Sequence, residues 1–390
     1  MIAVAWLCAV ACTAPASAQR RLDLGITGTA VYDSNIARAS RALAAARGIV
    51  REDVRFTPAA TLDVLVPVGR HALFATALAG YDFHARNHQL DRERLEARSG
   101  VNLRFAQCRA DIFGILSRRQ SELDDITLGP VNNRETVGSI NFEGRCERPA
   151  GLVPRVAAQY QEGRNSREQR RSADLDRSLI EGGLGYTTPS LGTAELFGRF
   201  LEARYRNRVV LAGGLPRSDG FGAYTIGLSY TREVGTALRG MVAAGYTQVE
   251  PRQLDLPRFD GLTWRAELLA NPLGRLRGTL EIAREVDASN RVDVSYVVED
   301  QVGGRLDYRI SQAVRAQARL VVRQREFEGG TRTGLGINEE ETRSVFAALF
   351  VEATPNITLR FDAEHEERQA DNPLFNYQST QLGVTTSLKF

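Results

Sequence analysis

Apolar and polar side chains alternate without a break over the last nine residues of the chain. Leu382, Val384, Thr386, Leu388 and Phe390 are apolar or β-branched, and the positions between them hold small or polar residues. A period of two residues places the two classes on opposite faces of a β-strand. The end of the chain therefore predicts a strand with one apolar and one polar face.

The same alternation recurs from residue 22 to the end, for example over residues 22–32, 53–66, 95–105, 238–246 and 314–323. The segments have the length of tilted strands that cross an outer membrane. After the N-terminus no run approaches the roughly 20 apolar residues of a spanning helix. We expect an all-β, antiparallel transmembrane barrel of about eighteen strands, or about sixteen if the weakly alternating residues 111–117 and 153–160 form none.

The connections between these segments are alternately short and long. Short turns are expected near residues 67, 107, 148, 189, 234, 272, 311 and 355, and longer charged connections at 33–51, 118–134, 161–174, 206–220 and 326–341. Outer-membrane barrels have short periplasmic turns and longer extracellular loops. The pattern therefore predicts an outer-membrane barrel of a Gram-negative bacterium, with both chain ends on the periplasmic side.

Aromatic residues fall near the ends of the expected strands. One group lies at the long-loop ends (Tyr32, Tyr81, Phe83, Tyr160, Tyr246) and another at the short-turn ends (Phe105, Phe142, Tyr186, Tyr230, Tyr308, Phe350, Phe390). Two belts of rings at the headgroup levels are typical of a membrane barrel. The alternative, a soluble β-sandwich, would concentrate its aromatic residues in the middle of its strands.

Residues 1–18 have the features of a secretory signal peptide. An apolar stretch up to Cys12 precedes the small residues Ala16, Ser17 and Ala18, although no basic residue comes before the stretch. We expect cleavage before Gln19 and a single barrel domain over 19–390. Cys12 is a weaker alternative as a lipidated residue, because the later site is better formed.

Two cysteines remain in the mature chain, Cys108 and Cys146. They fall at the beginning of the fifth expected strand and at the end of the sixth, which are antiparallel neighbours. An even pair in an oxidising compartment suggests a disulfide. We therefore expect a bridge at the periplasmic rim.

Charged residues occupy the polar face of the expected strands. If this face lines the lumen, the candidate lining residues are Arg55, Arg104, Arg199, Arg265, Arg277, Arg315, Arg319, Arg360, Glu267 and Glu281. Such residues can stabilise the wall as cross-strand ion pairs. Alternatively, the arginine forks can bind acidic sugars that pass through the lumen. Alternation along a strand shows only which face a residue occupies, so it fits both interpretations.

The connection after the first strand predicts a short helix. Asp33 and Ser34 can cap a helix that runs through Ala37 and Ala44 to a stop at Gly48. Arg38 and Arg41 would lie on one face of it. Such a helix could fold inward as a constriction or lie on the rim.

No catalytic or metal-binding pattern is found. The four histidines have no Cys or carboxylate companion at the spacing of metal ligands, and there is no nucleophile elbow, phosphate loop or dinucleotide fingerprint. We therefore expect a protein that is not an enzyme, with neither cofactor nor metal and without a nucleic-acid partner. Membrane lipid is the expected surrounding of its outer face.

Two segments carry a resemblance to known outer-membrane proteins. The alternating end on Leu382, Val384, Leu388 and Phe390 resembles the closing strand of bacterial barrels, which implies recognition by the barrel-assembly machinery. Residues 31–38 (VYDSNIAR) are similar to a segment near the mature N-terminus of the β-barrel porin-2 type of protein. That group is found with exopolysaccharide and capsule export genes.

The resemblance implies an outer-membrane conduit for a secreted polysaccharide, acting with periplasmic polysaccharide-export proteins. The alternative is a general or substrate-selective diffusion porin for small solutes; such porins often carry a long third loop that folds inward. The third long connection here, 118–134, is of middling length, which favours export. A structural or adhesive barrel with a closed lumen is a third possibility.

Overall fold

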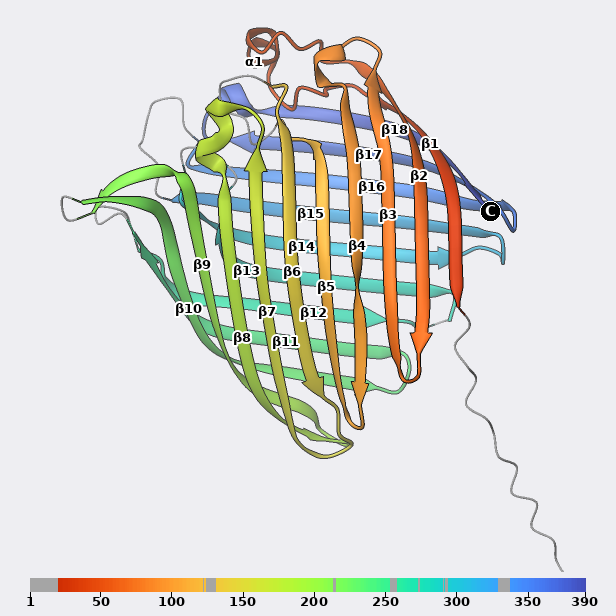
Figure 1. The fold of residues 1–390 in the computed structure, drawn as a ribbon, viewed down its shortest axis with the longest axis vertical. Helices are drawn as coiled ribbons and strands as arrows, with labels where there is room; N and C mark the ends of the chain where they lie inside the picture. Colours follow the sequence, from red (N-terminus) through yellow and green to blue (C-terminus); the bar gives the residue numbers. More distant parts are fainter. Residues whose placement is uncertain are drawn as a thin grey trace, which may run out of the picture.

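The computed structural model describes residues 20–121, 123, 131–212, 215–252, 258–272, 274–289, 291, 294–328 and 337–390. Within these residues, eighteen antiparallel strands form one sheet, and β1 pairs with both β2 and β18, so the sheet closes into a barrel (Figure 1). The expected fold and strand number are confirmed, without recourse to the smaller count. The expected signal peptide lies outside the described residues.

The eighteen strands are β1 (Arg21–Asp33), β2 (Asp53–Val68), β3 (His71–His84), β4 (Arg92–Phe105), β5 (Cys108–Gln120), β6 (Arg134–Cys146), β7 (Gly151–Asn165), β8 (Leu175–Thr188), β9 (Gly192–Ala212), β10 (Leu215–Val234), β11 (Leu238–Pro251), β12 (Asp260–Ala270), β13 (Leu276–Ala288), β14 (Tyr296–Arg309), β15 (Val314–Glu328), β16 (Glu339–Thr354), β17 (Ile357–Ala370) and β18 (Tyr377–Lys389). The helical elements are α1 (Arg41–Ala46) and the 3₁₀ turns η1 (His88–Leu90), η2 (Glu168–Ala173) and η3 (Pro373–Phe375). None of the described helices is long and apolar enough to span a membrane.

Alternation of side chains sets the inside and the outside of the wall. In β1, Leu22, Leu24 and Ile26 are more than half exposed on the outer face, while Thr29 points inward and its hydroxyl meets that of Thr385 on β18 at 3.1 Å. Large apolar side chains remain exposed on the outer face of nearly every strand. In a bilayer this face contacts lipid and the polar face lines the lumen.

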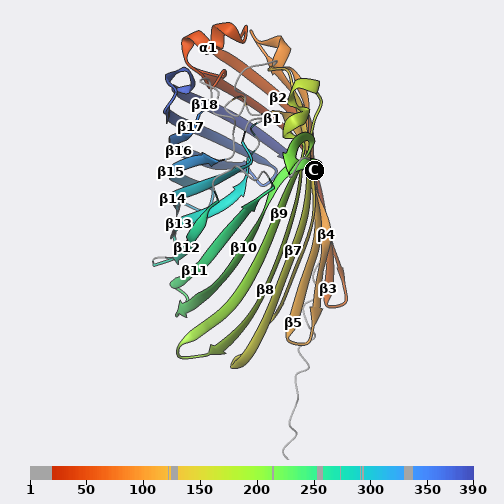
Figure 2. The same ribbon diagram turned by 90° about the vertical axis from the view of Figure 1, so that its left-hand side faces the viewer.

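Short turns lie at one end of the barrel, and the long connections, α1 and the 3₁₀ turns lie at the other (Figures 1 and 2). β1 begins and β18 ends at the short-turn side, and the Phe390 amide donates a hydrogen bond of 2.8 Å to the Leu24 carbonyl. The first and last strands therefore seal the barrel where the sequence places them.

The expected connection at 206–220 is wrong. β9 continues to Ala212 and β10 begins at Leu215, so most of these residues extend a hairpin that projects past its neighbours (green in Figure 1). The ladder of the hairpin shifts register between Ser218 and Asp219. The many charges of this segment indicated a loop, but charged side chains are compatible with a strand whose two faces meet water.

Nearly all the aromatic residues assigned to the two belts are on the outer face, but Phe350 is not. Phe350 alternates with the outward-facing Leu349 and stacks against Arg315, with 4.1 Å between the guanidinium carbon and the ring centroid. Its side chain therefore lies in the lumen. The sequence correctly predicted that Phe350 lies at the short-turn end of its strand, but the prediction that it faces the membrane is wrong.

The helix after β1 is shorter than expected. α1 begins after Ser40, whose hydroxyl accepts a hydrogen bond from the Leu43 amide, so the cap is not Asp33 or Ser34. Gly48 has a φ of 65°, the left-handed conformation of a helix stop. Arg38 precedes the helix and Arg41 is its exposed first residue, so the two arginines do not form one face of a constriction helix.

Cys108 and Cys146 lie directly opposite each other on β5 and β6, and their sulfur atoms are bonded at 2.01 Å. The bridge is at the short-turn end of both strands. It joins positions 38 residues apart, which gives an entropic stabilisation of about 4 kcal/mol on the chain-entropy model.

Candidate functional site: the barrel lumen

The inner half of the lumen contains a cavity of about 800 Å³ along β7–β13. Arg155 on β7 bridges two carboxylates there, at 2.5 Å from Glu181 on β8 and 2.7 Å from Glu195 on β9. Arg199 on β9 contacts the other oxygen of Glu181 at 2.5 Å. Two guanidinium groups and two carboxylates therefore form one network on adjacent strands, as the cross-strand interpretation requires.

A second ion pair lines the same cavity on β12 and β13. Arg265 Nη2 lies 2.6 Å from Glu281 Oε1. Glu267 lies directly opposite Glu281 in the ladder between these strands. All three residues share the parity that the sequence assigns to the lumen face.

Arginine and phenylalanine interleave on the lumen face of β15–β17. Arg315 lies over Phe350, while Phe346 has Arg319 at 5.3 Å and Arg360 at 5.6 Å from its ring centroid. Arg319 also pairs with Glu364 at 3.2 Å, and Arg360 with Asp362 at 2.9 Å. Stacking on a ring occupies the flat face of a guanidinium and leaves its N–H edge for hydrogen bonds.

The arginines of these pairs are more exposed than their carboxylates. In the pairs Arg155–Glu195, Arg199–Glu181, Arg265–Glu281, Arg305–Asp307, Arg319–Glu364 and Arg360–Asp362, the arginine side chains are 35–50% exposed and the carboxylate side chains 8–34%. The water in the inner half of the lumen therefore meets mainly guanidinium groups. Arg177–Asp287, near the outer end, has the opposite order.

Two further predicted lumen arginines stand apart from these groups. Arg55 on β2 lies opposite His84 in the ladder, and its Nε atom is buried without a hydrogen-bond partner. Arg104 lies near the short-turn end of β4, opposite Arg109 on β5, and its backbone amide donates to His71 Nδ1 at 3.2 Å. Neither residue belongs to the ion pairs that line the cavity.

Long connections fold over the outer end of the lumen. Their buried apolar residues form one group, here called the outer loop cluster: Ala37, Ala39, Leu43, Ala44, Ile49, Leu90, Leu123, Val131, Val294, Val297, Phe327, Ile337 and Phe375. Leu123 and Val131 come from the β5–β6 connection and Val294 from the β13–β14 connection, on opposite sides of the ring of strands. The cluster therefore spans the extracellular mouth.

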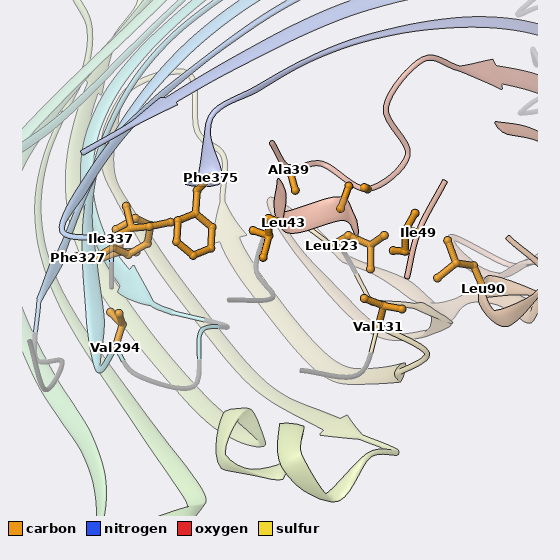
Figure 3. Packing of buried hydrophobic residues seen from close by; sticks show 13 residues of the cluster. Ala39, Leu43, Ile49, Leu90, Leu123, Val131, Val294, Phe327, Ile337 and Phe375 are labelled. Carbon is orange, nitrogen blue, oxygen red and sulfur yellow. The ribbon is translucent and has the colours of Figure 1, made fainter. Parts of the chain in front are cut away.

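Figure 3 shows the arrangement of this cluster. Phe327 and Ile337 lie at one side, Phe375 and Leu43 in the middle, and Leu90 at the other side. A fully buried Leu, Ile, Val or Phe side chain contributes about 1.5 to 3 kcal/mol. The packed side chains make the cluster a stable part of the fold.

A hairpin also folds into the lumen. β13 stops pairing with β12 at Arg284, whereas β13 and β14 remain paired up to Ala288 and Tyr296. The outer part of this pair, here called the inward hairpin (285–289 and 295–299), buries Tyr296 and Val298 against the lumen side of β8–β11. It therefore parts from β12 while β14 stays paired with β15, and it narrows the outer half of the barrel.

Tyr205 on β9 anchors the inward hairpin. Its hydroxyl lies 2.8 Å from the Ser289 carbonyl oxygen and 2.7 Å from that of Ser295, and it accepts a bond of 3.0 Å from the Ser289 amide. Arg177 on β8 adds an ion pair of 2.9 Å with Asp287. The inward hairpin is thus held by side chains of β8 and β9 at Asp287, Ser289 and Ser295.

Comparison with protein families gives one match. Residues 200–390, which include β10–β18, match the family described as "Putative beta-barrel porin 2". This part of the chain is similar to that family. The resemblance to the β-barrel porin-2 type of protein is therefore confirmed over residues 200–390, and with the closed barrel it identifies an outer-membrane porin of a Gram-negative bacterium.

Solved structures with a similar fold include three porins from pseudomonads. OccK2 (OpdF) of Pseudomonas aeruginosa, in complex with glucuronate, is 11% identical with a TM-score of 0.49, covering 95% of this chain and 98% of that one. OpdK of the same organism is 12% identical with a TM-score of 0.47, covering 95% and 99%. A BenF-like porin from Pseudomonas fluorescens Pf-5 is 11% identical with a TM-score of 0.49, covering 95% and 99%. Comparison with curated protein sequences found no match.

In this porin, Arg38 holds the connection after β1 and is not part of the cavity lining. Its guanidinium pairs with Asp33 at 2.9 Å and donates to the Ser379 hydroxyl on β18. Burial would lower the pKa of Arg38, but the Asp33 carboxylate outweighs burial, so the pKa is raised. The VYDSNIAR segment thus fastens the first long connection to the wall.

Several residues that shape the porin lumen were not predicted. Phe346 and Tyr205 alternate with outward-facing residues of their strands, and this alternation was the one sequence feature that could have placed them in the lumen. His84 and His88 both approach Asp91, at 3.0 and 3.5 Å, beside the 3₁₀ turn η1. Among the described residues, no group of three His, Cys, Asp or Glu could hold a metal ion.

Proposed function

We propose that this porin is a selective diffusion channel for small anionic solutes. The observation that carries the proposal is the exposure of the guanidinium groups over the carboxylates in the inner half of the lumen. Exposed arginines in a pore favour anions, because a permeating anion exchanges part of its hydration for N–H donors of opposite charge. The partly covered carboxylates keep the arginines in place and limit how tightly an anion binds.

The outer end of the lumen supports a small solute rather than a polymer. The outer loop cluster and the inward hairpin pack apolar side chains across the mouth. Leu123 and Val131, in the connection between β5 and β6, are buried in this cluster, as an inward third loop of a diffusion porin would be. A polysaccharide would require these buried contacts to separate along its whole path.

Polysaccharide export is the second candidate function. It is favoured by the family resemblance of residues 31–38 and of the C-terminal half. Export would require the extracellular connections to move apart, with a periplasmic partner at the short-turn end. A structural barrel with a closed lumen is the remaining alternative.

Ion selectivity tests the proposal directly. We would insert the purified protein into planar bilayers, apply a salt gradient and measure the reversal potential. We expect preference for chloride over potassium, and a shift toward cations in the Arg265→Gln/Arg319→Gln variant. The matched control, Arg343→Gln, removes a charge from the outward face of β16, where Arg343 pairs with Glu341, and should leave the potential unchanged.

Each other outcome points to one of the alternatives. A cation-selective or non-selective channel contradicts the proposal, and a folded barrel without conductance supports the closed structural barrel. Secreted polysaccharide should be measured in a deletion strain, its parent and a complemented strain. Loss of the polymer on deletion and its return on complementation would favour export instead.

A further inference from the structure

A hollow of about 310 Å³ lies at the periplasmic end of the lumen, between β13, β14 and β15. Five arginines line it, namely Arg275, Arg277, Arg305, Arg309 and Arg315, and their side chains are exposed. Arg277, Arg305, Arg309 and Arg315 share the inward parity of their strands. We call this group the arginine hollow.

The one carboxylate of the arginine hollow is already occupied. Asp307 accepts two hydrogen bonds from Arg305, at 2.7 and 3.1 Å, and one from Gln317 at 3.1 Å. Arg315 is farther away, at 3.8 Å. Among the described residues, the side chains of Arg275, Arg277 and Arg309 have no ion pair. The hollow therefore carries an excess of positive charge.

The geometry of Arg315 adds an oriented donor. Its guanidinium stacks on Phe350 at 4.1 Å, which fixes the plane of the group and leaves its edge free. A neighbouring hollow of about 410 Å³ shares Arg309 and Arg315 with the arginine hollow and also contains Phe350 and Glu352. Glu352 is exposed and forms no ion pair in the described structure, so the local charge remains positive.

We propose that the arginine hollow binds anions with two or more negative charges, such as di- and tricarboxylates, at the periplasmic mouth. Arg309 and Arg315 lie directly opposite each other on β14 and β15, closer than the Debye length of about 8 Å at physiological salt, so they act on one ligand together. A monovalent anion engages one fork, whereas a polyvalent anion can engage several forks with charge-assisted bonds. The inference rests on the proposed passage of anions and adds the class of anion selected.

Binding to the purified, full-length mature protein in detergent tests this site without requiring conduction. We would titrate tricarballylate and acetate by calorimetry at low salt. We expect tricarballylate to bind at least about tenfold more tightly than acetate, since several exposed ion pairs add up. Equal affinities for the two anions would overturn the inference.

Variants then locate the site. Arg277→Gln/Arg309→Gln should weaken tricarballylate binding about five- to tenfold. Asp307→Asn should tighten it, because Arg305 is released to the ligand. The matched control is Arg98→Gln on β4, which also removes a lumen arginine stacked on a phenylalanine, at 4.2 Å from Phe113, but lies outside the hollow. Arg98→Gln should leave the affinity for tricarballylate unchanged.

A loss of binding must be distinguished from a loss of folding. The folding of each variant is first checked by its heat-modifiable migration on a gel. If the double variant fails to fold, Arg309→Lys replaces it, because lysine keeps the charge but lacks the guanidinium fork. Arg309→Lys should weaken tricarballylate binding less than the double change. Unchanged affinity in Arg277→Gln/Arg309→Gln would overturn the inference even if the channel prefers anions. Conversely, tricarballylate binding in a barrel without anion preference would contradict the proposed function and leave the arginine hollow standing.

Discussion

At the scale of single residues, Asp33 and Arg38 form a largely buried ion pair in the outer half of the barrel. Asp33 is buried, and its carboxylate also accepts bonds from the Asn35 amide at 2.8 Å and the Ser379 hydroxyl at 2.7 Å. Removing one partner of a buried ion pair costs about 3 to 5 kcal/mol, because the other charge stays buried. This interaction connects the first long connection to the closing strand.

We therefore expect Asp33→Asn to loosen residues 34–49 while the barrel remains folded. Hydrogen exchange followed by mass spectrometry should show faster exchange in these residues alone. The control is Arg41→Gln, in the same connection, since Arg41 is exposed and forms no ion pair with another residue that the structure describes. Unchanged exchange in Asp33→Asn would mean that the apolar contacts of α1 suffice to hold the connection.

The disulfide is a second residue-scale feature with a measurable effect. Mass spectrometry of the non-reduced protein should find Cys108 and Cys146 joined in one cross-linked peptide pair. Cys108→Ser/Cys146→Ser should lower the free energy of unfolding in urea by up to about 4 kcal/mol, chiefly through the unfolded chain. Two free thiols in the native protein would contradict the bridge.

At the scale of elements, the inward hairpin is the feature that most changes the shape of the lumen. The Tyr205 hydroxyl accepts from the Ser289 amide and lies within donating distance of the Ser289 and Ser295 carbonyl oxygens, while the Ser295 amide donates to the Glu328 carbonyl. Unpaired buried backbone groups are costly, so this single hydroxyl helps to keep the hairpin against β8–β11. The same ring packs against the apolar face of the hairpin.

Tyr205→Phe should loosen the inward hairpin, which keeps its ladder to β15, by removing the hydroxyl while the ring remains. The loss of these bonds costs about 1 to 3 kcal/mol. We expect a larger or more variable single-channel conductance in planar bilayers. Tyr224→Phe is the control, because Tyr224 is exposed on the outer face of β10. Conductance that matches the unmodified protein would show that the hydroxyl does not hold the hairpin.

At the scale of the whole molecule, closure of the barrel depends on β18. This strand pairs with β1 on one side and β17 on the other, and its last residue bonds to Leu24. Phe390 is 72% exposed on the outside, where the assembly machinery is expected to meet it. β18 thus closes the finished barrel, and before closure it is expected to be recognised by the assembly machinery.

Deletion of Phe390 should reduce the amount of folded porin in the outer membrane, because the expected assembly signal is lost. The measurement is the heat-modifiable form in outer-membrane fractions after gel electrophoresis. Phe105→Ala is the matched control, since Phe105 is also exposed at the short-turn end but lies within the chain. A normal level of folded protein after the deletion would contradict recognition through the terminal residue.

The sequence by itself determined the features that follow from local alternation. A period of two fixed which residues of a strand share a face, so the strand number, the lumen arginines and the facing cysteines were predictable. Arg265, Arg319 and Arg360 all have the expected parity. The length of the connections also fixed which end is periplasmic.

Only the tertiary structure decided how the lumen is filled and which arginines are exposed. Parity cannot show where the ladder between β12 and β13 ends, so the inward hairpin was invisible in the sequence. The outer loop cluster brings together single apolar residues such as Leu90 and Phe375, which have no pattern of their own. Likewise, the sequence does not show whether the arginine or the carboxylate of a lumen ion pair is the more exposed partner. These features arise from packing between distant parts of the chain, which local periodicity does not encode.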